Sequence, residues 1–212
     1  MRLHLIFKIF FLLTVMIGCT SNTNYNDEDL NIDKDDFSDS LIVEDNLNNQ
    51  RESPYSFIAL GDSYTIGEGV NEDERWPNQF VDVAYENGVD FDQPLIIAET
   101  GWKTYDLLNA INQTNFTKKY DYISLLIGVN NQFNSRPIDE FEEDLNKLMD
   151  EMKRIKKNDG SIIIISIPDW GYTPFGESSD MSDISEQINL FNSSLRKFAT
   201  TNGLKYVDVT EI

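Results

Sequence analysis

Three short segments of the chain carry residue types that could hydrolyse an ester. Gly61-Asp62-Ser63 supplies a hydroxyl, Gly101 supplies a backbone N–H that no side chain shields, and Gly128-Val129-Asn130 supplies a carboxamide. An acyl-transfer enzyme needs a nucleophile and donors aimed at the oxygen that becomes negative in the tetrahedral intermediate. Each segment alone has an ordinary explanation as a turn or helix cap. Together, after successive predicted strands, they indicate a hydrolase site.

Five short apolar runs alternate with helical patterns in the part of the chain that holds these segments. This alternation predicts an α/β fold with three α/β/α layers around a five-stranded, parallel, flavodoxin-like sheet. The run SIIIISI is apolar on both faces, which is typical of a central strand. Because the carboxyl ends of parallel strands meet at one edge, we expect the three segments to meet there. The predicted strands are residues 57–60, 95–98, 122–127, 161–167 and 205–209.

Two long helices are predicted from apolar residues at steps of three and four. The first carries its apolar stripe from Ile138 to Ile155, begins at Pro137 and is expected to stop at Asn158-Asp159-Gly160. The second carries its apolar stripe from Ile184 to Phe198, with Ser182 or Asp183 as its cap and Asn202-Gly203 as its stop. Shorter helices are expected near residues 77–86 and 103–111.

At its three chemical segments the sequence resembles the SGNH or GDSL hydrolases, in particular their small bacterial lipoprotein members. The family's blocks are matched by Gly61-Asp62-Ser63-Tyr64, by Gly101 and by Gly128-Val129-Asn130, with Asn131 where Asp is usual. The resemblance covers about residues 55–212 and implies that Ser63 is the nucleophile. It also implies an oxyanion hole made by the Ser63 N–H, the Gly101 N–H and the Asn130 side chain. Cofactor-free hydrolysis of carboxylic esters through an acyl-enzyme follows, with short acyl esters, glycans and lysophospholipids all open as substrates.

Aromatic and amide residues follow the same strands. Trp102 comes after the proposed oxyanion glycine, Gln132 follows Asn130, and Trp170 follows the fourth strand. Such side chains could stack on a sugar ring or hold an acyl group, so we predict that they bind substrate. The alternative is that they pack beneath the loops.

The N-terminal quarter of the chain, residues 1–53, predicts an export signal followed by a tether. Residues 1–19 place Arg2 and Lys8 before an apolar run that is too short to span a bilayer. Met16-Ile17-Gly18-Cys19 resembles the bacterial lipoprotein cleavage box, so we expect lipidation of Cys19 and anchoring in the bacterial cell envelope; an ordinary secretory signal or an uncleaved anchor is the alternative. Residues 20–53 are acidic and poor in apolar side chains, which predicts a flexible tether before a domain at 54–212.

Charge and composition exclude several classes of function. The formal net charge of −20 would repel a nucleic-acid backbone. One cysteine and one histidine exclude an intrachain disulfide and a Cys/His zinc site within these residues. The glycines after the first strand fit neither G-x-G-x-x-G nor a P-loop. We therefore expect a monomer that acts on a small-molecule ester, with a nucleotide or flavin module as the generic alternative.

The proton acceptor for Ser63 is missing from the pattern. Imidazole is the usual base, yet the one histidine is His4, in the export signal. The family resemblance implies an Asp-x-x-His block after the fifth strand. We expect that the sequence is a fragment that stops before this block and before the last helix of the fold; the alternative is an inactive, ligand-binding relative. Asp62 or Glu68 would be a poor substitute with a pKa near 4.

We predict that residues 1–212 alone show little or no esterase activity, because loss of a triad member costs about 10⁴ to 10⁶ in turnover. A longer product of the reading frame should restore it. Assay of both proteins on a short-chain aryl ester checks this, and full activity of the 212-residue chain would overturn our account of the base.

Overall fold

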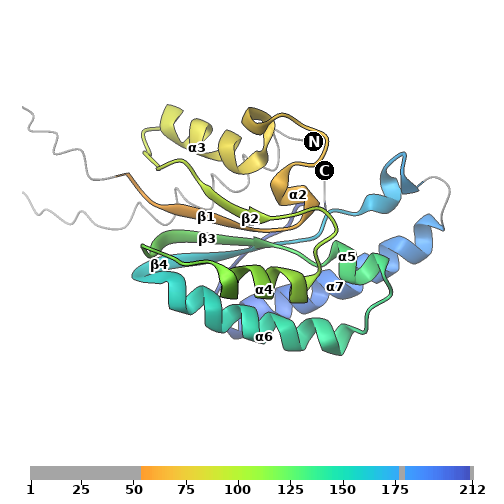
Figure 1. Ribbon diagram of the computed structural model, residues 1–212. Helices are drawn as coiled ribbons and strands as arrows, with labels where there is room; N and C mark the ends of the chain where they lie inside the picture. The colour runs from red at the N-terminus through yellow and green to blue at the C-terminus, as the bar shows by residue number, and fades with distance from the viewer. Residues whose placement is uncertain (1–53, 177–179, 211–212) are drawn as a thin grey trace, which may run out of the picture.

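A five-stranded parallel sheet forms the centre of the protein (Figure 1). The computed structural model describes residues 54–176 and 180–210; the predicted export signal, Cys19 and the predicted tether lie outside them. The strand order β2-β1-β3-β4-β5 is that of flavodoxin-like folds, so the predicted α/β class is confirmed. The strands are β1 (Phe57–Gly61), β2 (Leu95–Ala98), β3 (Tyr120–Leu126), β4 (Lys156–Ile165) and β5 (Lys205–Val207).

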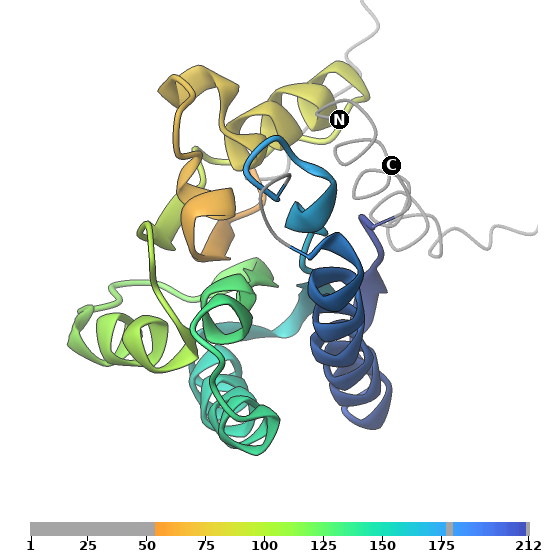
Figure 2. The ribbon, with the colours of Figure 1, turned by 90° about the vertical axis from the view of Figure 1, so that its right-hand side faces the viewer.

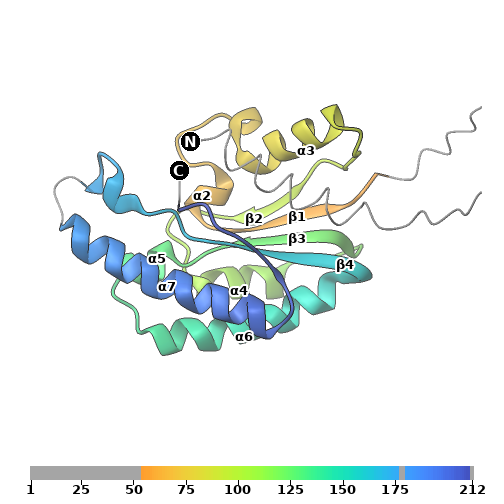
Figure 3. The same ribbon diagram turned by 180° about the vertical axis from the view of Figure 1, so that it is seen from behind.

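Helices cover the sheet on both sides (Figures 1 and 3). Helix α3 (Trp76–Glu86) packs on one face, together with the short α2 (Ser63–Ile66). Helices α4 (Thr104–Gln113), α6 (Ile138–Ile155) and α7 (Met181–Thr201) lie on the other. Shorter pieces complete the chain: η1 (Glu72–Glu74), α5 (Val129–Phe133) and η2 (Trp170–Tyr172). Within the described ranges no helix combines the length and apolarity needed to cross a bilayer.

Strand β4 shows why the sheet is buried on both faces. Successive strand residues point to opposite faces, so a strand covered on both sides must be apolar at every position. Ile162 and Ile164 join the core formed with α6 and α7, whereas Ile163 and Ile165 join a second core with Phe80 of α3. All four isoleucines are at most 4% exposed. The unbroken apolar run therefore predicted a central strand correctly.

Helix α6 has the predicted apolar stripe but ends earlier than predicted. Its inward residues, from Phe141 to Ile155, are almost fully buried, and acids occupy its first turn. The expected stop at residues 158–160 is wrong, because the helix ends at Ile155 and these residues belong to β4. Lys156 already pairs with Tyr120 of β3, and its ammonium donates to the carbonyls of residues 157, 158 and 160. Pairing with a neighbouring strand thus overrides the local turn signal.

Helix α7 begins before the predicted cap. The N-cap is Asp180, not Ser182 or Asp183, and its Oδ1 accepts from the backbone N–H groups of both residues at 3.0 and 3.3 Å. A carboxylate there satisfies N–H groups that have no partner inside the helix. The predicted stop is confirmed, since Asn202 ends the helix and Gly203 follows with φ 66°.

Candidate functional site

The ends of β1, β2 and β3 bring the three chemical segments to one edge of the sheet. Gly61 at the end of β1 is paired with Ala98 of β2 on one side and Leu126 of β3 on the other. The three segments therefore leave adjacent strand ends within a few residues. Figure 2 looks onto this edge, where α2 (orange) and α5 (green) face the viewer.

The first segment holds Ser63 at the start of a helical turn. Asp62 is the N-cap of α2, and its Oδ1 accepts from the Tyr64 N–H at 3.1 Å. Ser63 is the first helical residue, so its own N–H has no acceptor within the helix and remains available to a ligand. Gly61 makes this turn possible, because a Cβ there would collide with the Thr65 hydroxyl and the Leu126 carbonyl oxygen.

The second and third segments are joined by hydrogen bonds. Asn130 Nδ2 donates to the Trp102 carbonyl oxygen at 2.9 Å, which leaves the second N–H of the carboxamide for another acceptor. Thr100, beside Gly101, donates through its hydroxyl to Glu68, just beyond α2. Gly101 itself is exposed and has φ 85°, a left-handed conformation that favours glycine. The structure thus places the loops of Ser63, Gly101 and Asn130 side by side.

Asn131, the residue that departs from the family pattern, contacts the second loop as well. It is 1% exposed, and its carboxamide binds the backbone and the hydroxyl of Thr104, which in turn binds Asp144. Sequence reasoning missed Thr104 and Asp144. They lie 27 and 40 residues apart from the partners they bind, so no local pattern could have found them.

Asp62 differs from expectation in its ionisation. Burial raises the pKa of its carboxyl to about 7, while the N–H groups of Tyr64, Gly128 and Asp62 itself partly lower it. The expected pKa near 4 is therefore wrong, since the side chain is fully buried behind the nucleophile. Burial also raises the pKa of Tyr64 to about 12, helped by the nearby Asp62 and Asp169.

The predicted substrate residues differ in exposure. Trp102 is half-buried next to Gly101, whereas Gln132 and Trp170 are 4% and 8% exposed. The Trp170 indole donates to Gln132 Oε1 at 2.8 Å, so these two side chains bind each other. An exposed aromatic surface covers them, in which the Phe133 and Phe175 rings lie 5.5 and 5.6 Å from the Trp170 ring.

A cavity of about 750 Å³ opens beside the nucleophile. Its volume is within the range of small-molecule sites, and Ser63 is part of its wall. Apolar and aromatic side chains form most of the remaining wall, with three acids and one arginine. These lining residues include Tyr64, Val70, Trp76, Leu126, Tyr172 and Val209, together with Glu68, Glu74, Asp169 and Arg75.

Catalytic accessory groups are sparse in the described part of the chain. Residues 54–176 and 180–210 contain no histidine and no cluster of metal-binding side chains. Asp169 lines the cavity with Ser63, but its two oxygens accept from the Gly171 N–H at 2.9 Å and the Ser185 hydroxyl at 2.5 Å. Both oxygens of that carboxylate therefore already accept hydrogen bonds within the protein.

The pKa of Asp62 predicts a pH-dependent stability. An unfolded aspartate ionises near 3.8, whereas the folded one keeps its proton to about pH 7. Folding thus takes up a proton between these values, so this contribution to the free energy of unfolding is lost as the pH rises from about 4 to 7. Relative to Asp62→Asn, the unsubstituted protein should lose at most about 4 kcal/mol over this window.

Urea unfolding at several pH values measures this difference. The exposed Asp150→Asn is the matched control and should show no such trend. A stability difference between Asp62→Asn and the unsubstituted protein that stays constant from pH 4 to 8 would contradict the burial argument.

Comparison with solved structures supports the fold. The SGNH-hydrolase family esterase AlinE4 superposes with a TM-score of 0.60 at 16% identity, over 74% of this chain and 76% of that one. A G-D-S-L family lipolytic protein from Veillonella parvula gives a TM-score of 0.58 at 22% identity, over 73% and 78% of the two chains. At these identities the likeness shows a shared fold.

Comparison by sequence extends this to the family. A multidomain esterase from Ruminococcus flavefaciens is 30% identical over 118 residues, which is 53% of this chain and 15% of that protein, so the chain matches a small part of its relative. The GDSL-like Lipase/Acylhydrolase family matches residues 59–212, from β1 through all three chemical segments. The chain therefore belongs to the GDSL-like lipase/acylhydrolase family and has the fold of the SGNH hydrolases.

Proposed function

We propose that this protein is a serine esterase in which Ser63 is the nucleophile. The Ser63 N–H, the Gly101 N–H and the Asn130 carboxamide form the oxyanion hole. The observation that carries the proposal is the hydrogen bond from Asn130 Nδ2 to the Trp102 carbonyl oxygen, since it holds the carboxamide against the loop of Gly101. Donors fixed before the reaction cost no reorganisation when charge develops.

In the proposed reaction Ser63 Oγ attacks the ester carbonyl carbon and loses its proton to a base. The carbonyl oxygen becomes negative and accepts from the three donors. Collapse of the tetrahedral intermediate releases the alcohol and leaves an acyl group on Ser63, which water then hydrolyses. Residues 54–210 contain no histidine. The base therefore has to be a carboxylate or a group outside this range.

The substrate that we propose is a carboxylic ester with an apolar or ring-shaped group. The cavity next to Ser63 has the size for such a group, and its wall is largely aromatic and aliphatic. Trp102 borders the oxyanion loop, and Gln132 with Trp170 supports the exposed rings beyond Asn130. Acidic side chains in the cavity wall favour neutral over anionic substrates.

A second candidate is a ligand-binding lipoprotein that uses the same cavity without turnover. The observation in its favour is the lack of a histidine among the described residues. Both candidates need the cavity, and only the esterase needs a reactive Ser63. The reactivity of that hydroxyl therefore separates them.

We predict that a fluorophosphonate probe labels Ser63, and that free imidazole accelerates the labelling by standing in for the base. Ser63→Ala should abolish the labelling, and Asn130→Ala should slow it by about 10² to 10³ through loss of one oxyanion donor. In-gel fluorescence of the 212-residue protein provides the measurement. Ser193→Ala, an exposed serine on α7, is the matched control. Labelling that survives Ser63→Ala would remove Ser63 from the nucleophile role.

We further propose that the chain is exported and anchored in the cell envelope through lipid on Cys19, as a monomer. Several acyl chains on one residue give the stable attachment that a single chain does not. Expressed in a bacterium, the protein should fractionate with membranes, and Cys19→Ser should shift it to the soluble fraction. Intact-mass analysis of the membrane form should show the added acyl groups; an unmodified Cys19 in that form would refute the anchor.

A further inference from the structure

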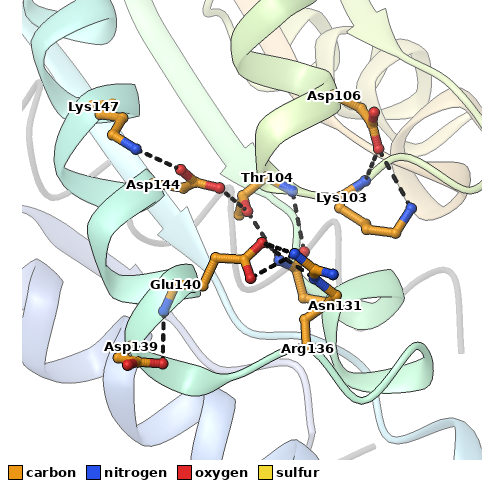
Figure 4. Close-up of polar contacts among 9 residues, drawn as sticks. All are labelled: Lys103, Thr104, Asp106, Asn131, Arg136, Asp139, Glu140, Asp144 and Lys147. Atoms are coloured by element: carbon orange, nitrogen blue, oxygen red, sulfur yellow. Dashed lines mark hydrogen bonds and ion pairs between the residues drawn. The ribbon is translucent and has the colours of Figure 1, made fainter.

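A buried chain of polar side chains joins Asn131, Thr104 and Asp144 (Figure 4). Asn131 Oδ1 accepts from the Thr104 N–H at 3.1 Å, and Asn131 Nδ2 donates to Thr104 Oγ1 at 2.9 Å. The same hydroxyl donates to Asp144 Oδ2 at 2.9 Å, and Lys147 donates to Asp144 Oδ1 at 3.1 Å. Asn131, Thr104 and Asp144 are 1%, 0% and 5% exposed, and together we call them the Thr104 clamp.

The donors and acceptors of the clamp match one to one. The Thr104 hydroxyl has one hydrogen, which goes to Asp144, and its oxygen receives one hydrogen from Asn131. The Thr104 N–H requires an acceptor, and only the oxygen of the Asn131 carboxamide can serve. A buried network in which every group is satisfied is rigid, whereas one mismatch leaves a costly unpaired group.

The clamp joins the two loops that carry the oxyanion donors. Thr104 opens α4 three residues after Gly101, and Asn131 directly follows Asn130 in α5. Gly101 faces open space where a side chain would project, since a Cβ placed there would meet nothing within 4 Å. The residues on either side of it are held by hydrogen bonds, at Thr100 and at Trp102 and Thr104.

We propose that Asn131, Thr104 and Asp144 are positioning residues that set the Gly101 N–H against the Asn130 carboxamide. This inference rests on the proposed function, because it takes both groups as oxyanion donors. Surrounding charges are already paired, Arg136 with Glu140 and Lys103 with Asp106, so they do not compete for Asp144. Asn131 is the key residue, because a carboxamide both accepts and donates.

Substitutions that swap the hydrogen-bond donors and acceptors of residues 131 and 144 test this proposal. Asn131→Asp replaces the donor to Thr104 Oγ1 by a second carboxylate, so two buried carboxylates face one hydroxyl hydrogen. In Asn131→Asp with Asp144→Asn, the hydroxyl donates to residue 131 and accepts from residue 144, which restores the matching. The double variant should therefore behave more like the unsubstituted protein than Asn131→Asp does. If Asn131 and Asp144 did not share one hydrogen-bond network through Thr104, the effects of the two substitutions would add.

Two measurements on the 212-residue protein test the role of the Thr104 clamp. Hydrogen exchange by mass spectrometry should become faster for Asn131→Asp in segments 100–104 and 128–131 but not in β4. With fluorophosphonate and imidazole, the maximal inactivation rate should fall about 10-fold while the probe concentration for half-maximal rate stays unchanged. Asn146→Asp, on the exposed face of α6, is the matched control. The double variant should recover in both measurements.

The outcomes separate this inference from the proposed function. If the fluorophosphonate probe does not label the unsubstituted protein, Ser63 is not the nucleophile. The hydrogen-exchange data then test by themselves whether the Thr104 clamp holds the two loops. Normal labelling with an unchanged rate in Asn131→Asp overturns the positioning role while leaving Ser63 in place. Faster hydrogen exchange throughout the domain would also overturn the positioning role. So would a double variant that labels more slowly than either single variant.

Discussion

Hydrogen bonds of two consecutive asparagines, Asn130 and Asn131, join the loops at the carboxyl edge of the sheet. A parallel sheet brings the ends of its strands to one edge, but the loops that leave them are exposed and have little packing. Asn130 and Asn131 bind the second loop at two points, at the Trp102 carbonyl and at Thr104. These two contacts join the second and third loops, and the hydrogen bond from Thr100 to Glu68 links the second loop to the first.

The core nevertheless sets where the edge lies. β1 is paired on both sides, so Gly61 sits between the ends of β2 and β3 and the three loops start level with one another. Gly128 adds a second constraint at the end of β3: its φ is 126°, and a side chain there would meet Phe141 and Ile167. The packing at Gly128 and the hydrogen bonds of Asn130 and Asn131 therefore constrain the same segment after β3.

The sequence predicted the elements whose signal is local. The apolar run of β4, the stripe of α6 and the Asn202-Gly203 stop each depend on neighbours a few residues apart, and each is confirmed. The end of α6 was wrong because pairing of Lys156 with Tyr120 is a long-range contact. Burial is equally invisible to local patterns, which is why the pKa of Asp62 and the partners of Thr104 emerged only from the structure. The roles of Ser63, Gly101 and Asn130 remain predictions.

The buried carboxyl of Asp62 has an electrostatic consequence for the chemistry next to it. At pH values below its pKa of about 7 this carboxyl is mostly protonated, so Asp62 then places little negative charge next to Ser63. An oxygen that gains negative charge at this edge would be repelled by an ionised neighbour in so dry a setting. The domain as a whole is acidic, and Glu68, Glu74 and Asp169 line the cavity with Ser63; burial keeps the adjacent Asp62 from adding a further negative charge below about pH 7.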